Sequence, residues 1–442
     1  MKHAFPYDEL DPVTCKSRGL HLGYDTLQLY ERDVMGNFSL TLVDSLDALA
    51  VLGDCDGFAQ AVKDTIEYVQ FDIDSTVQVF EVTIRMLGGL ISAHLIATDP
   101  KDTLKCASAM KSWYNTQLLD MAYDLGKRLL PAFTSSGSAL PLPRINLKDG
   151  VVQRNLGYST ETNTASVGTL ILEFATLSRL TGDSRFEQMA KDALFEIWAR
   201  RSDIDLLGNR IDSRSLEWTE KISSTGGGID SFFEYALKAY VALGDNDYLA
   251  LFNAAYSALQ RGSRDSLGYI YLNVHMDSGE LASPWIDSLS AFVPGMQVLA
   301  GDIEGAVRTH LVYYNIWKRY SAMPEVYDLF VHNATVPGYP GRPEFVESTY
   351  LLYQATKDPF YLDVGAMILR DLQQRTRTKC GFGGLKAVTE FHLEPRMESF
   401  MLSETLKYLY LLFDTDHPLN KLDTPYVFTT EGFAISAGIP FG

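Results

Sequence analysis

Several features that mark specialised protein classes are scarce or absent in this chain of 442 residues. It has four cysteines, which is few for a secreted protein. No run of about eighteen or more apolar residues occurs, so we expect no membrane-spanning segment. Residues Met1 to Pro6 do not form a signal peptide. No low-complexity stretch or charged tail marks a second domain, and residues 1–442 are expected to form one unit.

Basic side chains are also in deficit. The 38 Lys and Arg residues face 56 Asp and Glu residues, which gives a net charge of −18. Such a surface repels phosphate backbones and anionic membranes, so the charge argues against binding nucleic acid or charged lipid. A neutral ligand such as a sugar is compatible with it, and the charge also serves plain solubility. Composition is otherwise that of a globular protein, with 46% hydrophobic residues.

The hydrophobic pattern is that of an all-α protein. Apolar residues recur at helical spacing in seven stretches. These are Phe38 to Leu52, Val79 to Ile96, Gly168 to Leu180, Ile229 to Leu243, Leu289 to Ala300, Val346 to Ala355 and Phe400 to Phe413. A second amphipathic helix follows several of them: Phe186 to Arg200, Tyr248 to Arg261, Ile303 to Tyr320 and Tyr361 to Gln374.

Each of the seven stretches ends in a similar breaker, of which Leu243-Gly244-Asp245 is typical. Glycine takes the left-handed conformation that ends one helix, and aspartate then caps the next. The repeating unit is therefore a helical hairpin. Seven hairpins of irregular length fit a closed double ring of helices, an (α/α)7 barrel, better than the shorter repeats of common solenoids. An open solenoid remains an alternative at this point.

Acidic residues interrupt otherwise apolar helix patterns. Glu81 and Arg85 are four residues apart on one helix face, where a structural ion pair and a functional carboxylate are both plausible. Glu344 and Glu347 share a face just after Pro343, at a predicted helix start whose dipole acids also complement. Asp287 precedes an apolar run and is equally explained as a helix cap. Separate acids on different elements are what glycoside hydrolysis needs.

Longer blocks of sequence resemble glycoside hydrolase family 47, the class I α-mannosidases, and within it the ER degradation-enhancing α-mannosidase-like branch. The resemblance runs nearly end to end. Its blocks include Phe38 to Asp47, Phe80-Glu81-Val82-Thr83-Ile84-Arg85, Gly168 to Phe174, Gly228-Ile229-Asp230-Ser231 with Glu234-Tyr235, Trp285 to Leu289, Arg342-Pro343-Glu344, Glu404 to Tyr408 and Phe428-Thr429-Thr430-Glu431.

The resemblance implies a toroid of seven hairpins with the site in its bore, and a Ca²⁺-dependent, inverting α-1,2-mannosidase that trims high-mannose N-glycans of misfolded glycoproteins. It assigns Glu81, Asp287 and Glu344 as catalytic acids, with Glu344 as base and Glu81 or Asp287 as acid. It places the calcium at Thr430, through backbone carbonyl and hydroxyl oxygens that suit a hard cation. It implies a mannose subsite formed by Arg85, Arg342, Glu347, Phe400, Glu404 and Glu431.

The same resemblance implies a disulfide between Cys15 and Cys380, whereas Cys55 and Cys106 lie in helical patterns and are predicted to be free, buried thiols. It implies residence in the endoplasmic reticulum lumen, consistent with the sequons at Asn37 and Asn333, and a possible protein disulfide isomerase partner.

The chain departs from the trimming members of the family at two points. Phe433 and the Tyr327-Asp328 pair stand where those members carry histidines. Subsite recognition and turnover therefore stay open, and a mannose-binding lectin with little turnover is the main alternative function. A plain helical scaffold is disfavoured by the interior acids.

Overall fold

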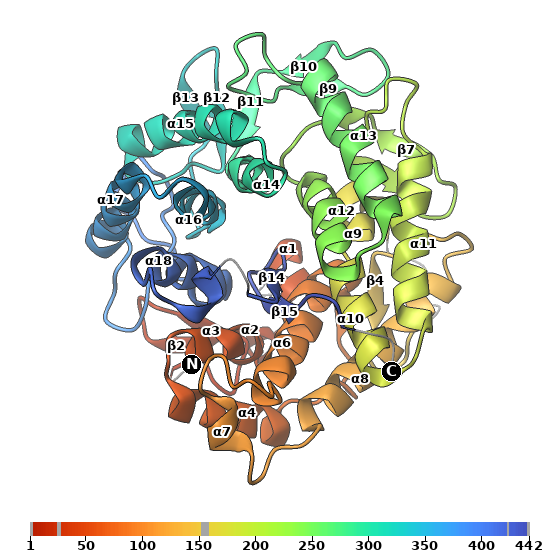
Figure 1. Ribbon diagram of the computed structural model, residues 1–442, viewed down its shortest axis with the longest axis vertical. Coiled ribbons are helices and arrows are strands. Elements are labelled where there is room, and N and C mark those ends of the chain that lie inside the picture. Colours follow the sequence, from red (N-terminus) through yellow and green to blue (C-terminus); the bar gives the residue numbers. More distant parts are fainter. Residues whose placement is uncertain (1–2, 24–27, 152–158, 422–423, 440–442) are drawn as a thin grey trace.

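The computed structural model describes residues 3–23, 28–151, 159–421 and 424–439. Two concentric layers of helices surround a central bore (Figure 1). The ring is closed, because α3 (Leu46–Val51) near the start of the chain contacts η6 (Met401–Thr405) near its end. This closure confirms the barrel and rules out the open solenoid.

The inner layer consists of helices that are buried on almost every side. In chain order they are α2 (Leu40–Asp44) with α3, α5 (Val79–Val82) continuing through η3 (Thr83–Leu87) into α6 (Gly88–Ala97), α9 (Thr164–Gly168) with α10 (Ile171–Thr181), α12 (Asp230–Leu243), η5 (Leu289–Phe292) with α14 (Val293–Leu299), α16 (Glu344–Thr356), and η6 with α18 (Leu406–Phe413). The seven apolar stretches predicted from the sequence correspond to these seven inner segments.

The outer helices bury one face only, as amphipathic helices do. They are α4 (Cys55–Tyr68), α8 (Gln117–Thr134), α11 (Arg185–Ala199), α13 (Asn246–Gly262), α15 (Ile303–Tyr320) and α17 (Pro359–Arg375). Short helices complete the described part of the chain: η1 (Leu20–Leu22), α1 (Leu29–Val34), α7 (Ala107–Met110) and η7 (Pro418–Asn420). After α18 the described chain forms no outer helix, because Pro418 and Pro425 interrupt helical hydrogen bonding there.

Most of the predicted breakers have the expected left-handed conformation. Gly182 and Gly244 end α10 and α12 with φ angles of 76° and 73°. The Asp245 side chain then accepts a hydrogen bond from the backbone of Asp247 at the start of α13. Lys357 takes the same left-handed conformation at the end of α16, which shows that this turn forms without glycine.

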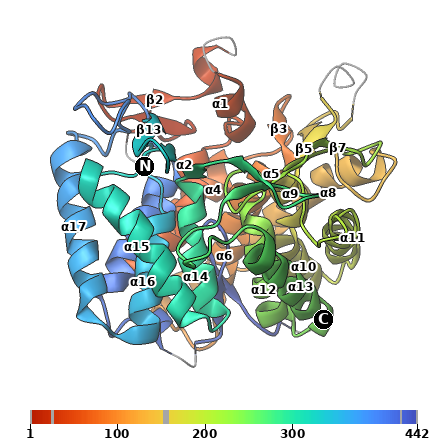
Figure 2. The ribbon, with the colours of Figure 1, turned by 90° about the horizontal axis from the view of Figure 1, so that it is seen from above.

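Small antiparallel sheets lie between the helices, and most gather at one face of the ring (Figure 2). Their pairings are β1 (Glu9–Asp11) with β2 (Lys16–Arg18), β3 (Thr76–Gln78) with β4 (Arg144–Asn146), β5 (Glu161–Asn163) with β6 (Arg210–Asp212) and β7 (Trp218–Glu220), β8 (Ile222–Ser223) with β9 (Asn273–His275) and β10 (Leu281–Ser283), β11 (Trp285–Asp287) with β12 (Val326–Asp328) and β13 (Asn333–Val336), and β14 (Tyr426–Phe428) with β15 (Ala434–Ser436). Inner helices begin at this face, so we call it the mouth.

The last hairpin, β14–β15, lies inside the ring (Figure 1). It contacts α6 and α12, and the backbone N–H of Gly438 donates to Ala242 at the far end of α12. Its turn, Thr429 to Phe433, is closed by a backbone hydrogen bond between those two residues. The hairpin thus enters from the face opposite the mouth and carries its turn into the bore.

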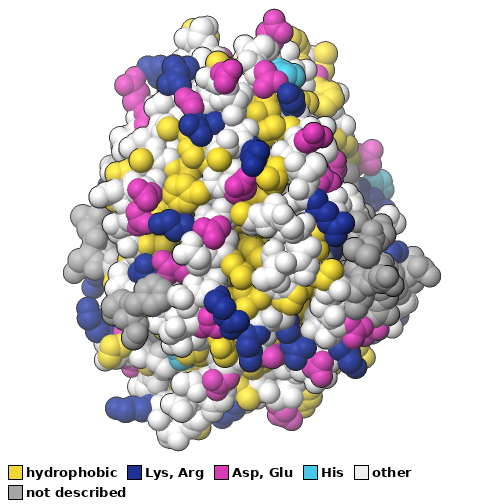
Figure 3. Space-filling view, turned by 90° about the vertical axis from the view of Figure 1, so that its right-hand side faces the viewer, with side chains coloured by type: hydrophobic (Ala, Val, Ile, Leu, Met, Phe, Trp, Pro, Cys, Tyr) yellow, Lys and Arg dark blue, Asp and Glu magenta, His cyan; other side chains and the backbone are white. Residues whose placement is uncertain are grey.

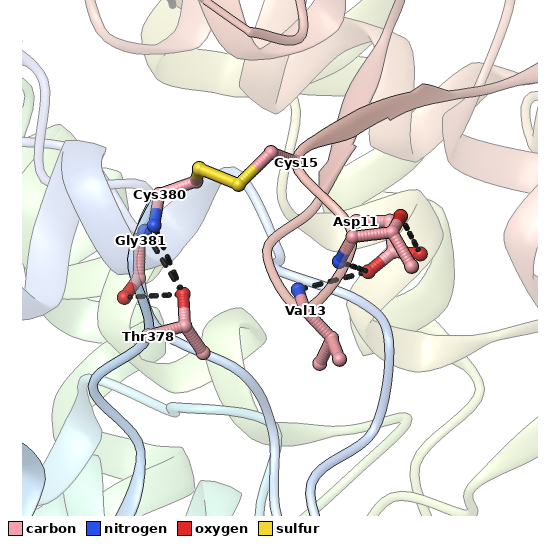
Figure 4. The surroundings of a disulfide bond; sticks show 7 residues. Asp11, Val13, Cys15, Thr378, Cys380 and Gly381 are labelled. Atoms are coloured by element: carbon pink, nitrogen blue, oxygen red, sulfur yellow. Dashed lines mark hydrogen bonds between the residues drawn. A yellow bond between two sulfur atoms is a disulfide. The ribbon is translucent and has the colours of Figure 1, made fainter.

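Both pairs of cysteines are bonded. The predicted Cys15–Cys380 disulfide is present, with Cα atoms 5.6 Å apart, and joins the N-terminal hairpin to the loop after α17 (Figure 4). The prediction that Cys55 and Cys106 are free thiols is wrong, because they form a second disulfide with a Cα separation of 4.8 Å. Both residues lie at helix starts rather than within helices, where the loop before α7 meets α4.

One apolar stretch among the described residues, Val79–Ala97, is long enough to cross a bilayer. It is the α5–η3–α6 segment of the inner layer, and 78% of its apolar window is buried within the protein. Its apolar character is therefore explained by the core. On the face shown in Figure 3, basic and acidic side chains are interspersed.

Candidate active site

A cavity of about 270 Å³ opens in the bore near the mouth. Nine of the ten predicted site residues line it, and only Asp287 does not. The nine are Glu81, Arg85, Arg342, Glu344, Glu347, Phe400, Glu404, Thr430 and Glu431. They come from three inner segments and from the turn of the C-terminal hairpin, so the ring brings together residues up to 350 positions apart.

Arg85 links the first inner wall to the hairpin turn. Its Nε donates to Glu81 at 2.9 Å, and its Nη1 donates to Glu431 at 2.8 Å. Burial opposes the charge of Arg85, but Glu431 and Glu81 raise its pKa well above the ordinary value. The residue lies on η3, a π-helical turn, which rotates the following side chains relative to a regular helix.

Phe400 lies between two guanidinium groups. The Arg85 Cζ is 5.7 Å and the Arg342 Cζ is 5.8 Å from the centre of its ring. Arg342 is fixed in turn by two hydrogen bonds of 2.7 Å each to the carboxylate of Glu325. This arrangement gives the cavity one apolar surface flanked by donors, a combination suited to a ring with an apolar face and hydroxyl edges.

Six glutamates line the same cavity, and four of them are strongly perturbed by burial. Burial is the main cause that raises the pKa of Glu344, Glu347, Glu404 and Glu431, and repulsion from neighbouring carboxylates adds to the shift for each of them. The Oε2 atom of Glu344 is buried and has no hydrogen-bond partner among the described residues. Such a cluster is costly unless protons or a cation compensate it.

One buried lysine compensates part of this charge. Lys238 on α12 pairs with Glu234 and lies 3.9 Å from the Glu347 carboxylate. The Tyr408 hydroxyl donates to Glu347 at 3.5 Å. The sequence did not single out these two supporting side chains, since both sit in apolar helix patterns that read as core.

Asp287 lies beside the cavity, in its wall. Its Oδ2 accepts the backbone N–H of Gly227 at 3.0 Å, and its Oδ1 accepts both the N–H and the hydroxyl of Ser290, at 3.0 and 3.1 Å. A side chain at Gly226 would collide with this carboxylate, at 1.9 Å. These contacts are those of a cap that holds the 226–228 loop against η5, and they use both carboxylate oxygens.

Asp230 does line the cavity, although no role was predicted for it from the sequence. Its Oδ1 accepts the N–H of Ser231 at 2.8 Å. Burial, followed by repulsion from Asp287 and Glu234, raises its pKa to about 7. The signal was available, because Asp230 lies in one of the blocks that carried the family resemblance.

Thr430 lies at the floor of the cavity, on the hairpin turn. Its backbone N–H donates to the Tyr235 hydroxyl at 3.4 Å, and that hydroxyl donates to Glu173 at 2.5 Å. Within residues 3–23, 28–151, 159–421 and 424–439, no group of three or more His, Cys, Asp or Glu side chains converges closely enough to hold an ion directly. A metal ion here would need backbone, hydroxyl and water oxygens.

Phe433 is fully buried behind the site. Its ring abuts Gly88 and Gly89, where an added Cβ would come within 2.8 Å and 3.3 Å of it, and Lys407 lies 5.4 Å from its centre. The residue is therefore part of the packing between the hairpin and α6. Tyr327 and Asp328, the other departure from the trimming members, lie on β12 at the mouth.

Known proteins of one family match this chain over nearly its whole length. The family model described as Glycosyl hydrolase family 47 matches residues 1–437. The chain is 45% identical over 433 residues to ER degradation-enhancing alpha-mannosidase-like protein 1 of Schizosaccharomyces pombe, and 45% identical over 437 residues to ER degradation-enhancing alpha-mannosidase-like protein 3 of Homo sapiens. Each alignment covers 98% of this chain, but 54% and 46% of those relatives, so the chain spans about half their length.

A solved structure supports the fold independently. The α-1,2-mannosidase from Trichoderma reesei superimposes with a TM-score of 0.83 at 23% sequence identity, over 99% of this chain and 95% of that one. The two chains share the same barrel of helical hairpins.

Proposed function

The chain belongs to glycosyl hydrolase family 47, and from this premise we propose that it removes α-1,2-linked mannose from high-mannose N-glycans of misfolded glycoproteins, with inversion, in the endoplasmic reticulum lumen. The observation that carries the proposal is the cavity itself. Carboxylates from four inner segments and the hairpin turn meet around one aromatic ring and two arginines. Its volume of about 270 Å³ is below the ~300–1,000 Å³ of drug-sized ligand pockets and suits a single sugar ring.

Sugar binding is assigned to the polar and aromatic lining. Phe400 offers the apolar platform, and Arg85 and Arg342 donate to hydroxyl oxygens beside it. Glu347, Glu404 and Glu431 accept from hydroxyl groups. The sugar is neutral, so the acidic protein as a whole does not repel it.

Glu344 is proposed as the base that activates the attacking water. Its unpartnered Oε2 is the acceptor available for a water proton. Because burial raises the pKa of Glu344, the carboxylate needs positive charge nearby to stay ionised at neutral pH.

Proton donation to the leaving oxygen is proposed for Asp230, ahead of Glu81 and in place of Asp287. A pKa of about 7 allows Asp230 to carry a proton at neutral pH. Glu81 is tied to Arg85, and Asp287 has both oxygens engaged with backbone and hydroxyl donors. In the inverting mechanism the acid and the base act on opposite sides of the sugar.

Calcium is proposed as the cofactor on the chemistry of the donor set. The lining offers oxygen atoms only, from Thr430 and from glutamates whose mutual repulsion a cation would relieve. Thr430 would hold the ion through its hydroxyl and carbonyl oxygens. When bound, Ca²⁺ would supply the positive charge that keeps Glu344 ionised.

The test is mass profiling of a mannose-rich N-glycan after incubation with the protein, alone and with a protein disulfide isomerase as possible partner. Release of mannose by the wild type and its loss in Glu344→Gln, with glycan binding retained, is the expected result. A wild type that binds the glycan but never releases mannose, with or without the partner, would instead establish the lectin alternative. Mannose release by Glu344→Gln at the wild-type rate would exclude Glu344 as base.

A further inference from the structure

The sheet β11–β12–β13 lies at the mouth with two different faces. Tyr327 on one face packs against Tyr320 of α15, with ring centres 6.3 Å apart. Side chains alternate along β11, so Ile286 is buried at 4% exposure while Trp285 is 46% exposed on the other face. Trp285 therefore presents part of a large apolar ring to water on the outer face of this sheet.

The Trp285 ring is held in place by a hydrogen bond at its edge. Its Nε1 donates to Asp328 Oδ2 at 2.9 Å, directly across the strand pair. The other oxygen of Asp328 accepts the backbone N–H groups of Phe330 and Val331, at 2.8 and 3.0 Å. The indole is therefore ordered before any ligand arrives, which removes part of the entropic cost of binding.

The exposed face of β11 leads to the cavity. Asp287 lies two residues beyond Trp285 on the same face and bonds Gly227, next to the lining residue Gly228. Leu289, two residues further, is itself in the lining. At a rise of about 3.3 Å per residue, Trp285 stands about 7 Å farther from the cavity than Asp287.

We propose that Trp285 is an outer platform for the glycan, on which a sugar unit stacks that lies outside the cavity in the same oligosaccharide, with Asp328 as its positioning residue. The proposal rests on the proposed function and extends it to the longer substrate. A pyranose has an apolar C–H face that matches an indole ring, and its hydroxyl edges stay in water. The neighbouring Phe330 is more exposed, at 68%, but no side-chain hydrogen bond fixes its ring.

The experiment compares kcat/KM for a high-mannose oligosaccharide and for the disaccharide α-1,2-mannobiose. In Trp285→Ala the ratio of oligosaccharide to disaccharide kcat/KM should fall about tenfold, mainly through KM for the oligosaccharide. Trp285→Phe keeps an aromatic face without the indole N–H and should give a smaller fall, as should Asp328→Ala. The matched control is Phe391→Ala, which removes an aromatic ring that is 77% exposed elsewhere on the surface and should keep the ratio.

An unchanged ratio in Trp285→Ala would overturn the platform, whether neither substrate loses activity or both lose it equally; equal losses would indicate a structural role. A wild type that hydrolyses neither substrate would contradict the proposed function alone. The platform is then tested by calorimetric titration with the oligosaccharide, where Trp285→Ala should bind about tenfold more weakly than wild type and equal affinity would refute it.

Discussion

The assignment of Asp230 over Asp287 can be tested by two isosteric substitutions with opposite expected effects. Asp230→Asn removes the proposed proton donor but keeps an oxygen for the Ser231 N–H. General acid catalysis contributes about 10²–10⁴-fold, so we expect kcat to fall by that factor. Asp287→Asn should cost much less activity, since the residue caps the cavity wall.

The two substitutions should also differ in thermal stability: Asp287→Asn should lower Tm, whereas Asp230→Asn should not. In Asp287→Asn the new NH₂ group faces the Gly227 N–H, so a buried donor loses its acceptor at a cost of about 1–3 kcal/mol. The unfolding entropy of about 2.1 cal/mol/K per residue gives about 0.9 kcal/mol/K for a chain of 442 residues, so Tm should drop by about 1–3 °C.

Asp230→Asn should raise Tm at pH 8. The folded pKa of about 7 lies above the ordinary 3.8, so the ionised carboxylate destabilises the fold, and stability is lost as pH rises through 7. At about 1.4 kcal/mol per pKa unit the gain is at most about 4 kcal/mol, and it should vanish below pH 4.

The assay pairs mannose release with calorimetric Tm at pH 5 and pH 8, with chelator present in the Tm measurements so that no cation offsets the charge. Full activity in Asp230→Asn, together with loss of activity at unchanged Tm in Asp287→Asn, would refute this assignment and return the catalytic role to Asp287.

Two further predictions concern the ion and the ring closure. Removing calcium with a chelator should lower activity, and it should lower Tm because the free energy of unfolding falls by about 2.7 kcal/mol if the ion had been present at a hundred times its Kd. The Tm of Thr430→Val should respond less to the chelator, and an unchanged Tm in the wild type would contradict calcium binding at this site. Lys407→Met should destabilise by about 3–5 kcal/mol, because Lys407 is fully buried at 2.9 and 3.0 Å from the Asp47 carboxylate across the closing seam; the exposed Lys111→Met is the control, and equal Tm values for the two variants would contradict the role of the pair.

The inner helices could be predicted from the sequence because each carries a long apolar pattern and a breaker with a definite backbone requirement. Gly182 and Gly244 show the left-handed conformation that this reasoning needs. The strands at the mouth could not be predicted, since most are three residues long and too short to show alternation. The second disulfide was missed because Cys55 and Cys106 lie in helical patterns, which do not show that the starts of α4 and α7 meet in space.

The site was predictable in part. Glu81 and Arg85 were visible as an i, i+4 pair, and the structure shows their hydrogen bond. Asp230 was overlooked because an acid at a helix start is usually a helix cap. The sequence does not show that Asp230 lines the cavity while Asp287 lies in its wall. Glu404 lies on a π-helical turn, as Arg85 does, and such turns shift the helix face in a way that a regular period cannot reveal.

The position of the C-terminal hairpin also sets the order in which this molecule can become functional. Residues 429–433 follow every inner helix in the chain, so the floor of the cavity is the last part of the site to be synthesised. A nascent chain that stops short of β14 would have a ring that is open at both ends, with Arg85 deprived of Glu431 and the cavity without Thr430. Completion of the site thus depends on a segment of only a few residues near the end of the described chain.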